Sequence, residues 1–124
     1  MNTLSDEDFD MLISRAMDTL PERDINNLKN IVVTYADEPD EYQTQKLQLR
    51  GDSLLLGLYE GIPLTQRGAG YNLVLPDKIT LFKVPLITYA LWRNTDIFEE
   101  IRHTLWHEIA HYYGLNHTQI HALE

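Results

Sequence analysis

One helical repeat near the end of the sequence constrains the fold more than any other feature. From Thr95 onward apolar residues recur every three or four positions, which predicts an amphipathic helix over residues 96–113 with Thr95 as its N-cap. Gly114 follows directly and can adopt a positive φ, so we expect it to end the helix. The helix must bury one apolar face against the rest of the chain, and that face consists of Ile97, Ile101, Leu105, Ile109 and Tyr112.

The same helix carries most of HEIAHYYGLNH, residues 107–117, which combines three histidines with a glutamate. His107 and His111 are four residues apart, so they point within about 40° of each other and are separated by roughly 6 Å along the axis. Two imidazoles so placed can bind one tetrahedral zinc ion. Glu108 is rotated by about 100° from His107, which places its carboxylate beside the metal as a general base and not as a ligand.

The third histidine of this segment requires the helix to end before it. A continuous helix would carry His117 about 120° away from His111, whereas a chain reversal at Gly114 can bring it back toward the metal. We therefore predict His107, His111 and His117 as zinc ligands, with a fourth position open for water as in catalytic zinc sites. The alternative is a histidine-rich helix whose imidazoles make ordinary hydrogen bonds.

Two further histidines and a tryptophan are weaker candidates. His103 lies one turn before His107, and we expect it at the surface or behind the ligands, because three ligands already complete the site. For His121 two alternatives remain: its side chain makes a local hydrogen bond, or it lies near the cleft. Trp106 is interpreted as a core residue.

Three tyrosines and an arginine complete the candidates. Tyr112 and Tyr113 could donate to an oxyanion, but helical aromatic residues usually pack, so we expect at most one of them in the cleft. Tyr59 and Arg67 are possible substrate contacts, on the basis of their position in or before a glycine-bearing loop.

The remaining sequence predicts an α+β fold with a small sheet of about three to four strands. Ser5 begins a helix signal that Pro21 stops, and residues 118–123 are expected to form one short terminal turn or helix. Leu86–Arg93 stays unassigned. The expected elements are a helix over 6–19, strands over 30–37, 54–61 and 78–85, loops over 38–52 and 62–72, and a terminal turn or helix over 118–123.

The composition narrows the chemistry and the partners. Cysteine is absent, so a metal site must use imidazole and carboxylate. Residues 1–41 hold 11 acids against three bases and so contribute −8 to the net charge of −9, which disfavours nucleic acid or anionic lipid as a partner. The N-terminus lacks the basic start of a secretory signal, and no run of about 20 apolar residues occurs. We expect one cytoplasmic domain over residues 1–124, without membrane contact.

The motif also resembles known families. HEIAHYYGLNH fits the zincin metallopeptidase pattern, and its long form is that of the metzincins, which have a methionine-containing turn downstream; here the last methionine is Met17. The whole chain is more similar to the small bacterial minimal zincin family, through LLGLYEGIPLTQRG (55–68), LPDKITLFKVPL (75–86) and HEIAHYYGLNHTQIHAL. This resemblance implies a short zincin-like α+β domain with zinc at His107 and His111 and a catalytic Glu108. Members of that family often carry aspartate at the position of His117.

The sequence hypothesis is a zinc-dependent peptidase that acts on peptide or protein substrates, with Glu108 as the base that takes a proton from zinc-activated water. A strand edge over residues 78–84 is one place for an extended peptide to bind. The main rival is a metal-dependent endoribonuclease, because the bacterial rRNA-maturation nucleases carry a similar histidine array, although without glutamate at the position of Glu108. A non-catalytic zinc-binding domain is the third reading.

Overall fold

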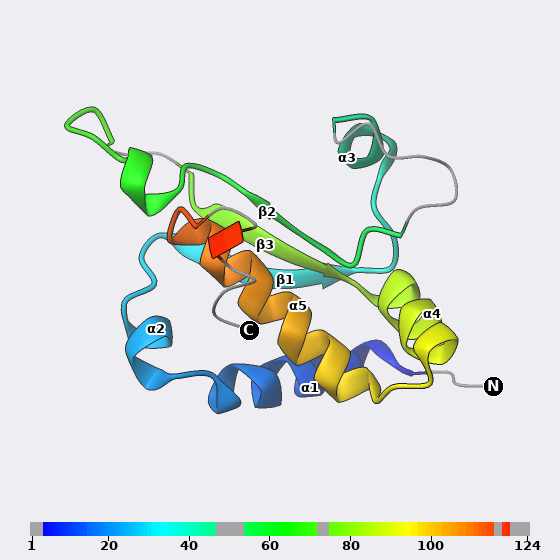
Figure 1. The fold of residues 1–124 in the computed structure, drawn as a ribbon. Coiled ribbons are helices and arrows are strands. Elements are labelled where there is room, and N and C mark those ends of the chain that lie inside the picture. Colours follow the sequence, from blue (N-terminus) through cyan, green and yellow to red (C-terminus); the bar gives the residue numbers. More distant parts are fainter. Residues whose placement is uncertain (1–3, 47–53, 72–74, 116–117, 120–124) are drawn as a thin grey trace.

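The computed structural model describes residues 4–46, 54–71, 75–115 and 118–119. These residues form five α-helices, one short 3₁₀ helix and a three-stranded sheet, which is the predicted α+β architecture (Figure 1). Thr118 and Gln119 are helical, and the rest of the predicted terminal helix lies outside the described residues.

The first helix follows the sequence prediction. Helix α1 spans Asp6–Thr19, and the Ser5 side chain caps it by accepting a hydrogen bond from the Asp8 N–H at 3.1 Å. Phe9, Ile13 and Ala16 form its buried face. Helix α2, Glu22–Asn26, was not predicted, because five residues are too few to show a helical period.

The sheet consists of β1 (Ile31–Ala36), β2 (Gly57–Glu60) and β3 (Asp77–Phe82). Its order is β1-β3-β2, with β1 parallel and β2 antiparallel to β3. The central strand is therefore β3, and the prediction that residues 78–84 offer a strand edge to a peptide is wrong, because β3 is paired on both sides. Of the two edge strands, β2 is the one that lies beside the histidine motif.

The segment after β3 departs from the prediction. The chain leaves the sheet at Phe82 and enters α4, Lys83–Arg93, so the predicted strand ends three residues early and the unassigned residues 86–93 are helical. Pro85 fits in the first turn of α4, where its missing N–H needs no partner.

The predicted loop over residues 38–52 contains a helix, α3, Glu41–Lys46. Asp40 and Gln43 start it with a reciprocal capping box: the Gln43 N–H donates to Asp40 Oδ1 at 2.7 Å, and the Asp40 N–H donates to Gln43 Oε1 at 2.9 Å. The second predicted loop contains the 3₁₀ helix η1, Leu64–Gln66. The structure describes neither 47–53 nor 72–74.

Helix α5, Ile97–Tyr112, carries the motif, and Asp96 is its N-cap in place of the predicted Thr95. Asp96 Oδ2 accepts from the Glu99 N–H at 3.3 Å, while the Thr95 hydroxyl donates to the Glu100 carboxylate at 2.6 Å. The two residues thus share the start of the helix, but the capping bond belongs to Asp96.

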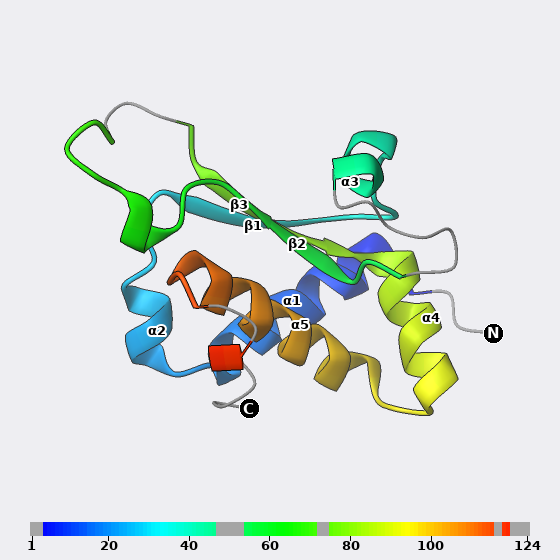
Figure 2. The same cartoon turned by 45° about the horizontal axis from the view of Figure 1, so that its top comes forward.

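The core lies between the sheet and the helices α1 and α5, which cover one face of the sheet (Figure 2). Gly57 brings β2 close to α5, because a Cβ atom on Gly57 would lie 2.7 Å from Thr104 Cγ2. None of the helices in the described segments has the length and apolar character to cross a membrane. The fully buried core residues include Phe9, Ile79, Leu81, Leu86, Ile101, Leu105 and Ile109.

Candidate metal centre

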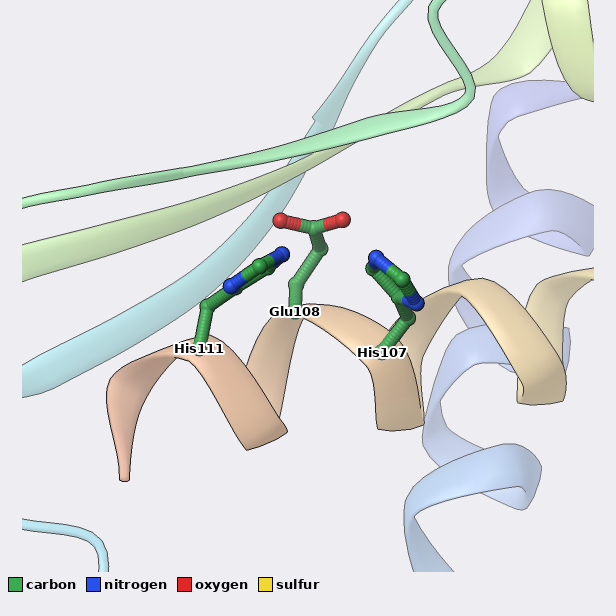
Figure 3. Close-up of side chains that lie close together, drawn as sticks. All are labelled: His107, Glu108 and His111. Carbon is green, nitrogen blue, oxygen red and sulfur yellow. The ribbon is translucent and has the colours of Figure 1, made fainter. Parts of the chain in front are cut away.

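Three side chains of the motif converge on the side of α5 that faces the sheet. One ring nitrogen each from His107 and His111 and one carboxylate oxygen of Glu108 all lie within 4.8 Å of one another. The two imidazole rings are 4.9 Å apart between centroids and inclined by 78°, and the carboxylate stands between them on the side toward the strands (Figure 3). Two imidazole nitrogens at this separation suit zinc, so His107 and His111 fit this ion, and the Glu108 carboxylate lies beside them, where a base can act.

Glu108 is buried at the base of this site, with 8 % of its surface exposed. Burial raises the pKa of Glu108 to about 7, and a hydrogen bond from the backbone N–H of Tyr59 partly opposes that rise. A carboxyl group with a pKa near neutrality is suited to take up and release a proton under physiological conditions.

A cleft runs past the motif on both sides. One cavity of about 510 Å³ extends toward α4 and the start of α5, and another of about 560 Å³ extends toward η1 and the end of α5. Both are lined by Leu55, Gly57, His107 and Glu108, so the two cavities meet at the candidate metal centre.

The edge of β2 that faces away from β3 has no strand partner among the described residues, and it forms one wall of this cleft. The Phe82 N–H donates to the Leu56 carbonyl at 2.9 Å, and antiparallel pairs alternate between bonded and non-bonded, so Leu58 and Glu60 also bond toward β3. The backbone groups of Gly57 and Tyr59 therefore point away from β3, toward the cleft. The contact between the Tyr59 N–H and Glu108 agrees with this register.

Tyr59 and Arg67, predicted as possible substrate contacts, are joined in a buried network around Asp77. Arg67 pairs with Asp77 Oδ2 at 2.7 Å, the Tyr59 hydroxyl donates to the same oxygen, and the Ile62 N–H donates to Oδ1 at 3.2 Å. The side chains of Arg67 and Asp77 are 7 % and 3 % exposed. We call Tyr59, Arg67 and Asp77 the carboxylate clamp. Sequence reasoning missed Asp77.

Tyr112 and Tyr113 pack and do not line the cleft, in agreement with the expectation that at most one would. The buried Tyr112 hydroxyl accepts from the Lys29 N–H at 2.8 Å, and the Tyr113 hydroxyl donates to the Asp24 carbonyl. Both residues anchor the end of α5 to the segment between α2 and β1.

The other predicted residues are placed as follows. Trp106 is partly buried and packs against the core, and His103 is exposed at the surface, as expected. The predicted ligand His117 and the open candidate His121 lie outside the described residues, so the structure brings together only His107, Glu108 and His111 from the predicted set.

Gly114 ends the motif helix as predicted, with φ of 87°. A Cβ atom on Gly114 would also lie 2.4 Å from the Thr65 hydroxyl oxygen, so η1 packs directly on this turn. Glycine is therefore required here both by the backbone conformation and by the close approach of Thr65.

Comparison with known proteins agrees with this geometry. The model of a family described as zincin-like metallopeptidase matches residues 28–124, from the segment before β1 through the motif. A search of curated proteins gives no match.

Proposed function

Because the chain belongs to the zincin-like metallopeptidase family, we propose that it is a zinc-dependent peptidase that hydrolyses peptide bonds with Glu108 as the general base. The observation that carries the proposal is the convergence of His107, Glu108 and His111 within 4.8 Å, beside the free edge of β2.

In this proposal His107 and His111 hold the zinc ion through one ring nitrogen each, and His117 is the third ligand. Gly114 supports the choice of His117, because its positive φ turns the chain just after the helix. Bound zinc would lower the pKa of a water molecule to about 7 and polarise the substrate carbonyl.

Glu108 performs the proton transfers. Its carboxylate takes the proton from the attacking water and later delivers it to the leaving amine, so that one group serves as base and then as acid. In the metal-free protein burial raises the pKa of Glu108 to about 7, and a bound zinc ion would favour the charged form that accepts the proton. The Tyr59 N–H orients the carboxylate during both transfers.

The substrate binds as an extended strand along the edge of β2. Gly57 presents its N–H and C=O toward the cleft, and Tyr59 presents its C=O there, which are the groups that strand addition requires. Cavities on both sides of Glu108 give room for residues before and after the bond that is cleaved.

The sharpest test is Glu108→Gln, with Glu7→Gln on the exposed side of α1 as the matched control. We expect both variants to hold about one zinc ion per chain, and Glu108→Gln to lose about 10²- to 10⁴-fold in kcat on a mixed peptide library. An RNA library is screened in parallel. Loss of zinc from Glu108→Gln contradicts the role of base, and cleavage of RNA in place of peptide contradicts the proposed substrate.

The third ligand is tested by elemental analysis of His117→Ala against His103→Ala. We expect His117→Ala to bind zinc much more weakly and His103→Ala to bind it normally. An unchanged zinc affinity in His117→Ala would place the third ligand elsewhere in the chain.

A further inference from the structure

The carboxylate clamp lies outside the metal motif, and its contacts exceed what a local turn needs. Asp77 begins β3 and receives three donors: the Tyr59 hydroxyl, the Arg67 guanidinium and the Ile62 N–H. Gly61 makes room for them, because a Cβ atom there would lie 2.2 Å from the Asp77 carboxylate carbon. The chain thus curls tightly around a buried carboxylate at the end of β2.

Stability alone is a weak reason for such a network. Burying an ion pair removes two charges from water, and a well-packed apolar pair of similar volume is often at least as stable. The clamp is also placed at the end of the edge strand that lines the candidate metal centre. Both facts suggest that the clamp positions a residue near that site.

What it holds is Tyr59. This residue sits on an edge strand, so a neighbouring strand fixes only one of its sides. Its hydroxyl donates to Asp77, and its ring packs edge-to-face on Tyr112 at 6.3 Å between centroids. Its backbone N–H points away from β3 toward Glu108, which lines the same cavity, and it lowers the pKa of that carboxyl. Tyr112 lies four residues after Glu108 on the same helix, so Tyr59 contacts α5 at two successive turns.

Arg67 ties the same unit to the rest of the fold. Its guanidinium donates to the carbonyls of Ile62 and Lys29, each at 2.9 Å, and lies 5.0 Å over the Tyr112 ring. Since Tyr112 is itself bonded to Lys29, the clamp joins β2, β3, the start of β1 and the end of α5 into one rigid corner.

We propose that Asp77 is a positioning residue for Glu108, which it aligns through Tyr59. The phenol of Tyr59, anchored to Asp77, fixes the rotation of that residue about the strand axis, and this rotation aims its N–H at the Glu108 carboxylate. The inference rests on the proposed function, because it assigns Asp77 a part in the same reaction, but the contact with Glu108 can be measured without any substrate.

The experiment compares Tyr59→Phe, Asp77→Asn and the control Tyr113→Phe. Tyr59→Phe removes the hydroxyl and leaves the Arg67–Asp77 pair intact, so it remains informative if Asp77→Asn does not fold. Tyr113→Phe removes the hydroxyl that donates to the Asp24 carbonyl, on the residue just after α5, and leaves the hydrogen bonds of Asp77 in place. The readouts are the NMR shift of the Tyr59 backbone amide, with and without zinc, the zinc content, and kcat and KM for peptide cleavage.

We expect the amide proton of residue 59 to shift in Tyr59→Phe and Asp77→Asn in the same direction as in Glu108→Gln, with zinc content unchanged. We expect kcat to fall about ten-fold with little change in KM, because a small misplacement of a catalytic group slows the chemical step. Tyr113→Phe should change neither the shift nor kcat.

An unmoved amide signal in folded Tyr59→Phe, or an equal loss of kcat in Tyr113→Phe, overturns the inference and leaves the peptidase proposal intact. If the zinc-loaded protein cleaves no peptide, the peptidase proposal fails, and the amide shift alone then decides whether Asp77 positions Glu108.

Discussion

The protein buries two carboxylates about equally deeply but treats them differently. Asp77 is 3 % exposed and is bound by a guanidinium, a phenol and a backbone N–H. Glu108 is 8 % exposed, and burial raises its pKa against a smaller opposing effect from the Tyr59 backbone N–H. One carboxylate has its charge compensated by the fold, and the other does not.

This difference separates a carboxylate that holds other groups in position from one that can exchange a proton. A buried carboxylate with several donors is held as an anion and fixes the chain around it. A buried carboxylate with few donors has a raised pKa and can exchange its proton, which is the property a general base needs. Tyr59 connects the two, since its hydroxyl serves Asp77 and its N–H serves Glu108.

The largest expected effect on stability is that of Asp77→Asn. It leaves the Arg67 guanidinium buried without its counter-charge, and we expect the free energy of unfolding to fall by about 3 to 5 kcal/mol, measured by urea denaturation. Asp10→Asn, which changes an exposed carboxylate on α1, should change it by less than about 0.5 kcal/mol. Equal effects of the two substitutions would contradict the idea that the buried Asp77 carboxylate compensates the charge of Arg67.

The next effect is that of zinc itself. If His107 and His111 are ligands, a free zinc concentration 100 times the Kd should stabilise the folded protein by about 2.7 kcal/mol, seen as a rise in Tm. His107→Ala should abolish this rise, and His103→Ala, one turn earlier on the same helix, should retain it. A rise of equal size in both variants would show that the ion binds elsewhere.

Glu108→Gln is expected to stabilise the metal-free protein, by an amount comparable to the effect of zinc. Folding raises the pKa of Glu108 from 4.5 to about 7, so folding favours the neutral form. The ionised side chain therefore reduces stability progressively as pH rises from about 4.5 to 7, and by a constant amount above that. Since one pKa unit corresponds to about 1.4 kcal/mol, the neutral glutamine should stabilise the metal-free protein by about 3 kcal/mol at pH 8, whereas at pH 4 the two proteins should be nearly equal.

Zinc sharpens this prediction. A bound cation favours the charged form of a nearby carboxylate, so the advantage of Glu108→Gln at pH 8 should shrink when zinc is added. A glutamine that destabilises the metal-free protein at pH 8 would mean that Glu108 is as well compensated as Asp77, and the comparison between them would fail.

The metal motif could be predicted from sequence because its geometry is local. The directions of His107, Glu108 and His111 follow from positions along one helix, and the helix follows from its apolar period and its terminal glycine. Helix α1 was predicted for the same reason. The error at the N-cap concerned two adjacent residues, Thr95 and Asp96, that are both able to cap.

The clamp and the sheet order could not be predicted, because they depend on contacts between distant segments. Tyr59 and Asp77 are 18 residues apart and meet only through the pairing of β2 with β3. Strand order is set by that pairing and leaves no local signal, which is why β3 was taken for an edge. Helix α4 was missed because its sequence, KVPLITYALWR, mixes β-branched and aromatic residues with good helix formers.

The smallest expected effect on stability is that of Gly114→Ala, at the end of α5, where Thr65 of η1 packs on the chain. An alanine here must adopt a positive φ and displace the Thr65 side chain of η1, and we expect a loss of about 1 to 2 kcal/mol in the free energy of unfolding. Thr65→Ala removes the two Thr65 atoms nearest to the added Cβ. The loss of stability caused by Gly114→Ala is therefore measured in the wild-type and in the Thr65→Ala background, and the difference gives the steric part of the loss, separate from the backbone part.

If His117 is a ligand, Gly114→Ala should also weaken zinc binding, because the turn that directs the chain after α5 is altered. If zinc binding remains weaker in the Thr65→Ala background, the effect comes from the backbone turn. If zinc binding is unchanged in Gly114→Ala, the turn at the end of α5 does not contribute to the metal site.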